Sequence, residues 1–412
     1  MFLVSTAHGF SQEPVVEVLE INGLKKTKES FIRRLVKTKP GAVFDSIKVV
    51  TDIEKLNRLP GIANATVKQA KNAAGDYIIT YDLVENFTII PGLNISTANN
   101  GEFAFRTSLF EFNLFGRNQL IGGFYKRDVF NSYGAFWEAP YLFTNKLGIG
   151  LTYQNLASQE PVFFEENTVN YRFETRFAQA SILYEFDFHN RAELGINISK
   201  EEYDFLDGEL PDGIPIRLSA NKVTYRGEYE YNDIEVKYQY KSGFRSLLDV
   251  RFATGGDVFL KNSFIGRNDF EYFKRIGERG NWANRLRLGY ASNDETPFAP
   301  FALDNQLNVR GTGNTIDRGT ASIVLNTEYR HTFYEKGWFV VQGNAFIDTG
   351  TWRDPGGDLV GLVDGSTLKF YPGVGIRFIH KRIFNAVFRL DYGYGIGEDA
   401  TNGIVFGIGQ YF

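Results

Sequence analysis

Side chains able to do covalent or metal chemistry are few in this 412-residue sequence and lie far apart. There is no cysteine, which excludes a disulfide framework, a thiolate nucleophile and a zinc–thiolate site. Glu165 and Glu166 could supply acid–base groups, but no pattern of serine, histidine and carboxamide accompanies them. Histidine is too scattered for a metal-ligand spacing, at His8, His189, His331 and His380. The sequence therefore predicts no catalytic, metal or cofactor-binding residue, and a protein that is not an enzyme.

Composition narrows the class of protein. Hydrophobic residues make up 43% of the chain and the mean hydropathy is -0.25, so a sizeable core can be buried. No run of about 18 apolar residues occurs, which excludes a spanning helix and leaves a β-barrel as the form of any membrane span. The 16% of aromatic residues and the 42 glycines suit aromatic girdles and curved strands, although a large soluble all-β domain would also fit. A net charge of -4 gives no basic field that would attract nucleic acid.

Residues 1–12 and 13–86 differ from the rest of the chain in their patterns. Residues 1–12 are expected to be the remnant of a secretory signal peptide, with a short apolar piece but no basic start. Residues 13–86 are predicted to form a small α+β unit in the order strand, helix, helix, strand, strand. The second helix, capped by Asp45 or Ser46, is expected to bury one apolar face. That face would consist of Ile47, Val50, Ile53, Leu56 and Leu59.

From residue 87 to residue 412 the pattern is that of β-strands alternating with turns. Ala386 to Tyr394 alternates most clearly, with large apolar residues on one face and Arg389 and Asp391 on the other. The last strand is predicted to run from Ile404 to Phe412. Tight connections alternate with long ones, notably 204–219 and 293–318, as short periplasmic turns and long outer loops do. A sandwich would have short loops at both ends, so these lengths favour a mainly β protein with a transmembrane antiparallel β-barrel.

Two sets of motifs are more specific. The 13–86 unit resembles a POTRA (polypeptide-transport-associated) domain throughout, in its segments 19–23, 39–41, 57–59 and 82–85. The barrel region contains Asn308-Val309-Arg310-Gly311 in its longest loop and the glycine-bounded segment 343–350 on a later strand. The combination resembles the BamA, TamA and two-partner-secretion superfamily of outer-membrane assembly and translocation barrels, over residues 13–412. Relatives often carry several POTRA domains, and the single one recognised here favours a specialised role.

The resemblance implies about sixteen strands and a loop near 293–318 that folds back into the barrel lumen. In relatives the arginine of this loop, here Arg310, meets the aspartate of the later strand, here Asp348. A guanidinium in a lumen favours a bidentate carboxylate partner, although a solvated Arg310 without this contact is the alternative. The predicted site residues are Val309, Arg310 and Gly311 in the loop, and Gly343, Phe346, Asp348 and Gly350 on the strand. The end of the chain resembles an outer-membrane β-signal, carried by Phe406, Ile408, Tyr411 and Phe412.

Together these features predict an outer-membrane protein that assembles, inserts or translocates polypeptides. The POTRA-like unit would lie in the periplasm and capture an unfolded or secreted client chain through its open strand edges, or act only as a spacer. The expected partners are client polypeptides, outer-membrane lipid and other subunits of an outer-membrane machine, and not nucleic acid. Two alternatives remain open, a structural or accessory barrel subunit that moves no substrate and a passive pore.

Overall fold

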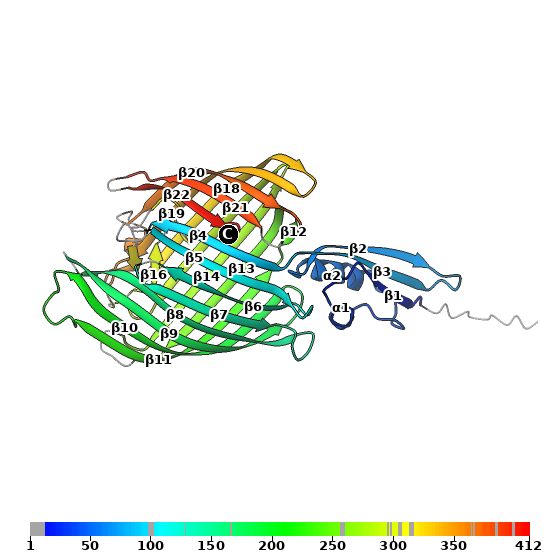
Figure 1. Cartoon of the computed structure of the whole chain (residues 1–412), viewed down its shortest axis with the longest axis horizontal. Helices are drawn as coiled ribbons and strands as arrows, with labels where there is room; N and C mark the ends of the chain where they lie inside the picture. Colours follow the sequence, from blue (N-terminus) through cyan, green and yellow to red (C-terminus); the bar gives the residue numbers. More distant parts are fainter. Residues whose placement is uncertain are drawn as a thin grey trace, which may run out of the picture.

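The computed structural model consists of a small N-terminal unit and a large β-barrel (Figure 1). It describes residues 13–97, 103–127, 129–164, 167–255, 260–294, 296, 299–303, 307–312, 317–363, 365, 367–383, 386–397 and 400–412. The expected signal-peptide remnant, residues 1–12, lies outside this set. Strands make up 65% of the structure and helices 6%. No helix in the described ranges is long and apolar enough to cross a membrane.

The N-terminal unit has the predicted order of elements. These are β1 (Val16–Asn22), α1 (Glu29–Leu35), α2 (Ser46–Asn57), β2 (Ile62–Lys71) and β3 (Tyr77–Glu85). The sheet order is β1-β3-β2, with β1 parallel and β2 antiparallel to the central β3. Asp45 caps α2, because its carboxylate accepts hydrogen bonds from the backbone N–H groups of Ile47 and Lys48. The two helices pack on one face of this sheet around Ile32, Leu56 and Ile79.

The predicted buried face of α2 is partly wrong. Leu56 and Leu59 are buried as expected, but Ile47 and Val50 are exposed, and Val49 and Asp52 take the inward positions. Asp52 can be buried because its carboxylate accepts from Lys37 N at 2.6 Å, Thr38 N at 2.8 Å and the Tyr81 hydroxyl at 3.0 Å. A buried carboxylate with three donors lets the helix turn a polar residue inward, which periodicity of apolar residues could not reveal. Burial and the nearby Asp52 together raise the pKa of Tyr81.

Sixteen antiparallel strands form a nearly closed barrel, the number that the resemblance implied. The strands are β4 (Ile89–Thr97), β5 (Phe103–Leu114), β6 (Gln119–Arg127), β7 (Asn131–Ala139), β8 (Leu147–Phe164), β9 (Asn167–Glu185), β10 (Asn190–Gly208), β11 (Arg217–Asn232), β13 (Tyr240–Ala253), β14 (Ser263–Ile276), β15 (Gly280–Ala291), β18 (Ala321–Lys336), β19 (Phe339–Arg353), β20 (Lys369–His380), β21 (Val387–Tyr394) and β22 (Asn402–Ile408). β22 meets β4 at the seam that completes the ring. Strands that follow one another in the chain also pair in the sheet. The register of each strand therefore depends on the register of the strand before it.

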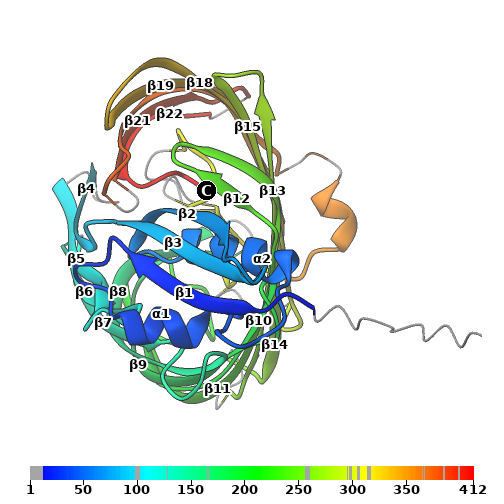
Figure 2. The ribbon, with the colours of Figure 1, turned by 90° about the vertical axis from the view of Figure 1, so that its right-hand side faces the viewer.

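The two ends of the barrel differ. At the near end, which faces the N-terminal unit, the connections are short, while the longer connections lie at the far end (Figure 1). The far-end segments include β16 (Phe301–Leu303), β17 (Asp317–Gly319) and the 3-10 turn η1 (Leu359–Leu362). One near-end hairpin is an exception, since β12 (Glu235–Lys237) folds back on the start of β13 inside the ring (Figure 2). Side chains along each strand alternate between the lumen and the outer surface. On β21, Arg389 and Asp391 face inward and are buried, while Phe388 and Leu390 face outward and are exposed.

The end of the chain departs from the predicted last strand. β22 ends at Ile408, and Gly409 has a backbone φ of 96°, which turns the following residues away from the wall. The last residues then lie within the ring, as Figure 2 shows. The prediction of a strand from Ile404 to Phe412 was therefore too long at its end, because a glycine that fits an alternating strand also permits a turn.

Candidate functional site in the barrel lumen

Arg310 and Asp348 lie together in the lumen, although they are 38 residues apart in the sequence. The guanidinium donates from Nε to Asp348 Oδ2 at 2.7 Å and from Nη2 to Oδ1 at 2.9 Å. The backbone N–H of Arg310 adds a third hydrogen bond to Oδ2, at 3.0 Å. Both side chains are fully buried. The geometry is the bidentate one that best matches a guanidinium to a carboxylate, and it rules out the solvated arginine that the sequence left open.

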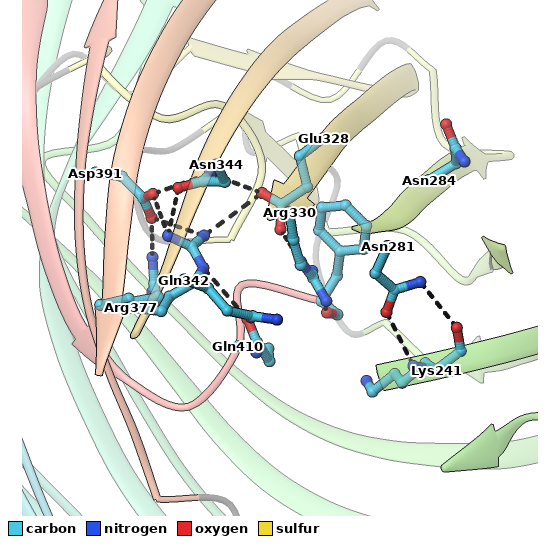
Figure 3. Close-up of polar contacts among 12 residues, drawn as sticks. Lys241, Asn281, Asn284, Glu328, Arg330, Gln342, Asn344, Arg377, Asp391 and Gln410 are labelled. Atoms are coloured by element: carbon cyan, nitrogen blue, oxygen red, sulfur yellow. Dashed lines mark hydrogen bonds and ion pairs between the residues drawn. The ribbon is translucent and has the colours of Figure 1, made fainter. Parts of the chain in front are cut away.

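Asp348 is one of several ionic partners around Arg310. Glu328 on β18 accepts from Arg310 Nη1 at 2.7 Å, and Asp391 on β21 lies 3.5 Å from the same nitrogen. Arg377 on β20 binds Asp391 at 2.7 Å and approaches Glu328 at 3.5 Å, and Arg330 also pairs with Glu328 (Figure 3). We call the set of Arg310, Glu328, Arg330, Asp348, Arg377, Arg389 and Asp391 the lumen arginine cluster. Its charges nearly cancel, as burial requires, because an unpaired charge in a dry interior is very costly.

Glu328, Arg330 and Arg377 belong to this site, although no sequence motif pointed to them. Alternation along the strands could have revealed them, because each of these residues occupies a position whose side chain points into the lumen. Four adjacent strands, β18 to β21, therefore each contribute at least one charged residue to the same patch of wall. Asn344 joins them, since its side chain accepts from Arg377 Nη1 at 2.8 Å.

Close backbone packing fixes the Val309-Arg310-Gly311 turn against the wall. Gly311 has a φ of 102°, and a Cβ at this position would lie 2.7 Å from the carbonyl oxygen of Gly393 on β21. The carbonyl oxygen of Gly311 accepts a hydrogen bond from Thr401 Oγ1 at 3.0 Å. Val309 is buried in a small apolar cluster with Leu303. The loop is therefore held by apolar, backbone and ionic contacts together.

The other predicted residues of the later strand fall into two groups. Phe346 belongs to the site, because its ring lies under the Arg310 guanidinium at 3.6 Å from Cζ to the ring centroid. Gly350 also faces the loop, since a Cβ there would lie 2.7 Å from the Leu303 side chain. A Cβ on Gly343 would instead meet the ring of Phe333, whose side chain is exposed. Gly343 therefore lies away from the lumen arginine cluster.

The predicted β-signal residues are also split. Phe406 and Ile408 are on β22, paired with Leu390 and Phe388 of the outward face of β21. Tyr411 lies in the lumen, with the Arg310 and Arg389 guanidinium carbons 4.4 and 4.9 Å from its ring centroid. Phe412 O accepts a hydrogen bond from Arg330 Nη2 at 3.2 Å. The end of the chain thus covers the lumen arginine cluster from the near side.

The N-terminal unit lies across part of the near mouth of the barrel (Figure 2). Lys55 of α2 pairs with Glu185 at the end of β9 at 2.6 Å, and Tyr141 Oη donates to the same carboxylate at 2.8 Å. Arg58 Nη1 donates to the carbonyl oxygens of Phe188 and Asn232 at 3.0 and 2.9 Å. These two basic residues at the end of α2 form what we call the mouth contact.

The inward hairpin of β12 and β13 covers another part of the near mouth. Its Tyr240 hydroxyl binds Thr332 at 3.0 Å and its Gln239 amide binds Glu335 at 2.8 Å, both on β18, from which β13 is separated in the wall by β14 and β15. Within the described ranges, no group of histidine and carboxylate side chains is arranged to hold a metal ion. The inward hairpin is thus held to the barrel wall by hydrogen bonds and covers part of the near mouth.

Comparison with known proteins identifies the class of the N-terminal unit. Residues 14–86 match the POTRA family model, described as a surface antigen variable number repeat. The order of strands and helices agrees with the expectation from the sequence motifs. The chain thus combines a POTRA domain with a 16-strand barrel.

Solved structures with the same architecture are similar over almost the whole chain. BamA from Haemophilus ducreyi lacking POTRA domains 1–3 matches with a TM-score of 0.59 at 14% identity, covering 97% of this chain and 85% of that one. CdiB from Escherichia coli gives 0.65 at 11% identity, covering 96% and 76%, and CdiB from Acinetobacter baumannii gives 0.63 at 12%, covering 96% and 74%. No curated protein sequence matches significantly. The fold is that of the BamA and CdiB barrels, with a single POTRA domain recognised in this chain.

Proposed function

We propose that this protein inserts or translocates polypeptides at the outer membrane, and that its POTRA domain captures the client in the periplasm. The observation that carries the proposal is the open outer edge of β2 on a POTRA domain that lies at the mouth of the barrel. The sheet order β1-β3-β2 leaves both β1 and β2 at edges. An extended chain can add to such an edge through main-chain hydrogen bonds, without a fixed sequence.

The two edges are not equally available. The outer edge of β1 is covered, because Val16 N donates to Ala42 O and Gly41 N donates to Val16 O, both at 2.8 Å. On β2, Ile62 N donates to Leu59 O, and the outward backbone groups of Ala65 bind the side chain of Asn57. Residues 67, 69 and 71 have the same parity as Ala65, so their backbone groups also point outward. In the described part of the chain, no segment pairs with β2 beyond Ala65.

The covered near mouth argues against a passive pore. The POTRA domain, the β12–β13 hairpin and the end of the chain each lie across part of it, an arrangement that a pore for free diffusion does not need (Figure 2). An accessory subunit that moves no substrate would share the same fold, and a client-binding experiment distinguishes it from a transporter.

The test uses the outward N–H of Gln69. Gln69→Pro removes that donor from the open edge and leaves the bonds to β3 intact, because proline is tolerated at an outward position of an edge strand. We expect photo-crosslinking of client chains to a probe at position 71 to fall several-fold, while Gln69→Ala keeps it. Deletion of Glu13 to Glu85 should leave a folded, inserted barrel without transport or assembly activity. Full activity of the deleted protein would assign the domain to a spacer, and unchanged crosslinking in Gln69→Pro would remove β2 as the client edge.

A further inference from the structure

A cavity lies where α1 of the POTRA domain meets the near rim of the barrel. It has a volume of about 250 Å³ and is lined by Ser30, Phe31, Arg34, Arg117, Gln119 and Tyr141. The β5–β6 turn is attached to the start of α1, since Lys28 N donates to Gly116 O at 2.9 Å. The β7–β8 turn is attached to its end, since Arg34 Nη2 donates to Tyr141 O at 2.6 Å. Two barrel turns and one helix therefore form the walls together.

The surroundings of the cavity are strongly basic. Seven of the 15 residues from Lys25 to Lys39 are lysine or arginine, and only Glu29 is acidic. Glu29 is already paired with Arg33 at 2.7 Å, and Lys26 is paired with Glu111. Among the described residues, no carboxylate lies within ion-pair distance of Arg34 or Arg117. The cavity thus presents two guanidinium groups that the protein does not neutralise, next to the Ser30 hydroxyl.

Exposed aromatic rings lie on the same two turns. The side chains of Phe115 and Phe143 are 70% and 60% exposed. Phe115 also has a backbone φ of 56°, a conformation that a bulky side chain rarely adopts. Aromatic rings at the rim of a membrane barrel are typical of the interface between acyl chains and headgroups. The turns therefore place apolar rings at the depth where the basic cavity would meet lipid headgroups.

We propose that this cavity binds the phosphate of an anionic phospholipid in the leaflet that faces the POTRA domain. Arg34 and Arg117 bind the phosphate oxygens, Ser30 adds a hydroxyl donor, and Phe115 and Phe143 lie among the upper acyl chains. Since α1 forms one wall, the bound lipid ties the POTRA domain to the membrane surface as well as to the barrel rim. The inference rests on the proposed membrane placement of the barrel but not on client handling, so its failure leaves the proposed function intact.

The absence of cysteine allows a clean test with the full chain. Phe143→Cys, labelled with a small apolar fluorophore, is reconstituted in phosphatidylcholine vesicles that contain a minor fraction of brominated lipid. The brominated lipid is phosphatidylglycerol in one sample and phosphatidylcholine in the other. We expect quenching to show about a five-fold enrichment of phosphatidylglycerol at the label, the ratio that corresponds to about 1 kcal/mol for one basic residue near the surface. Equal quenching by the two lipids would overturn the proposal.

Two charge variants locate the effect. Arg34→Gln with Arg117→Gln should abolish the enrichment, since glutamine at 34 can still donate to Tyr141 O and keep the helix attached. Lys48→Gln with Lys68→Gln makes the same change in net charge at exposed positions elsewhere on the POTRA domain, and should retain it. Arg117→Gln alone guards against a misfolded double variant, and it should lower the enrichment by at least half. Retention of the enrichment in the Arg34 and Arg117 variants would show that this is not a lipid site. Complete loss of the enrichment when inorganic phosphate is added would show that the cavity prefers free phosphate to a lipid headgroup, which would also overturn the proposal.

Discussion

The lumen arginine cluster and the mouth contact are both built from ion pairs, but their surroundings differ. In the cluster, Arg310, Glu328, Asp348 and Asp391 are completely buried. In the mouth contact, the side chains of Lys55 and Glu185 retain 13% and 8% exposure. Arg58 donates to two backbone carbonyl oxygens and lies over the Phe188 ring, but it has no carboxylate partner at hydrogen-bond distance among the described residues. When a fully buried charge loses its partner, no water molecule can take the place of that partner. Water can do so at a charge that is partly exposed. The comparison indicates that the loop is held more firmly to the barrel wall than the mouth contact holds the POTRA domain.

The largest expected effect is that of Arg310→Ala. It leaves Asp348 and Glu328 without their shared partner, which costs about 3 to 5 kcal/mol in a dry interior. We expect a lowered unfolding midpoint in urea, altered single-channel conductance and lowered function, with a barrel that still folds because strand pairing does not depend on this residue. Arg251→Ala, at a lumen arginine that is 42% exposed and pairs with Asp249, is the matched control and should cost about 1 kcal/mol or less.

The double variant Arg310→Ala with Asp348→Ala sharpens this result. Residues in direct contact are not additive, so it should be no less stable than the worse of the two single variants. Strictly additive losses would mean that the two side chains do not form the pair that holds the loop.

A smaller effect is expected from Gly311→Ala, which tests the close packing of the same loop. An alanine at a φ of 102° is strained, at a cost of about 1 to 2 kcal/mol, and its Cβ would also collide with the backbone of Gly393. Gly356→Ala is the matched control, since its φ is 77° but nothing lies within 4 Å of its Cβ. Unfolding in urea should show a larger loss for Gly311→Ala, and equal losses would mean that the close approach does not matter.

At the mouth contact, Lys55→Met should have a smaller effect on stability and a larger one on gating. The loss of stability should be smaller than at Arg310, because Glu185 keeps its hydrogen bond from Tyr141 and lies 4.0 Å from Arg191 when Lys55 is replaced. We expect the barrel to unfold as before, while conductance steps in planar bilayers become more frequent as the POTRA domain leaves the mouth. High salt should produce part of this effect in the unaltered protein. Lys68→Met, at an exposed pair with Asp82 away from the barrel, should behave as the unaltered protein does. Unchanged conductance in Lys55→Met would place the gate elsewhere.

The smallest effect is a pH dependence at Glu85, where the POTRA domain joins the barrel. Burial raises the pKa of its carboxyl, but hydrogen bonds from the backbone N–H groups of Lys26 and Thr27 outweigh burial and lower it overall. A lowered pKa in the folded state means stability that is present above the ordinary glutamate pKa and is lost as the pH falls through the lowered value. Glu85→Gln should flatten this part of the acid-unfolding curve of the POTRA domain, and Glu54→Gln should not. Superimposable curves for the two variants would exclude the linkage.

The sequence by itself determined the features that depend on local pattern. Alternation gave the strands and their inward faces, as Phe388 and Arg389 show, because side chains along a strand point to opposite sides. The order of elements in the N-terminal unit followed from periodicity and turn residues. The pairing of Arg310 with Asp348 also followed, but only through the resemblance of their motifs to those of a known superfamily.

Tertiary structure alone decided the rest. Glu328, Arg377 and Asp391 converge only because strand register and barrel closure bring four strands to one patch of wall, and no spacing in the sequence encodes that. Asp52 could replace an apolar residue inside the POTRA domain because three donors from other segments reach it. Gly409 could have continued the last strand. Instead, Arg310 and Arg330 contact the rings of Tyr411 and Phe412, which follow Gly409. The positions of these arginines in the lumen depend on the register of the strands that carry them or bind them.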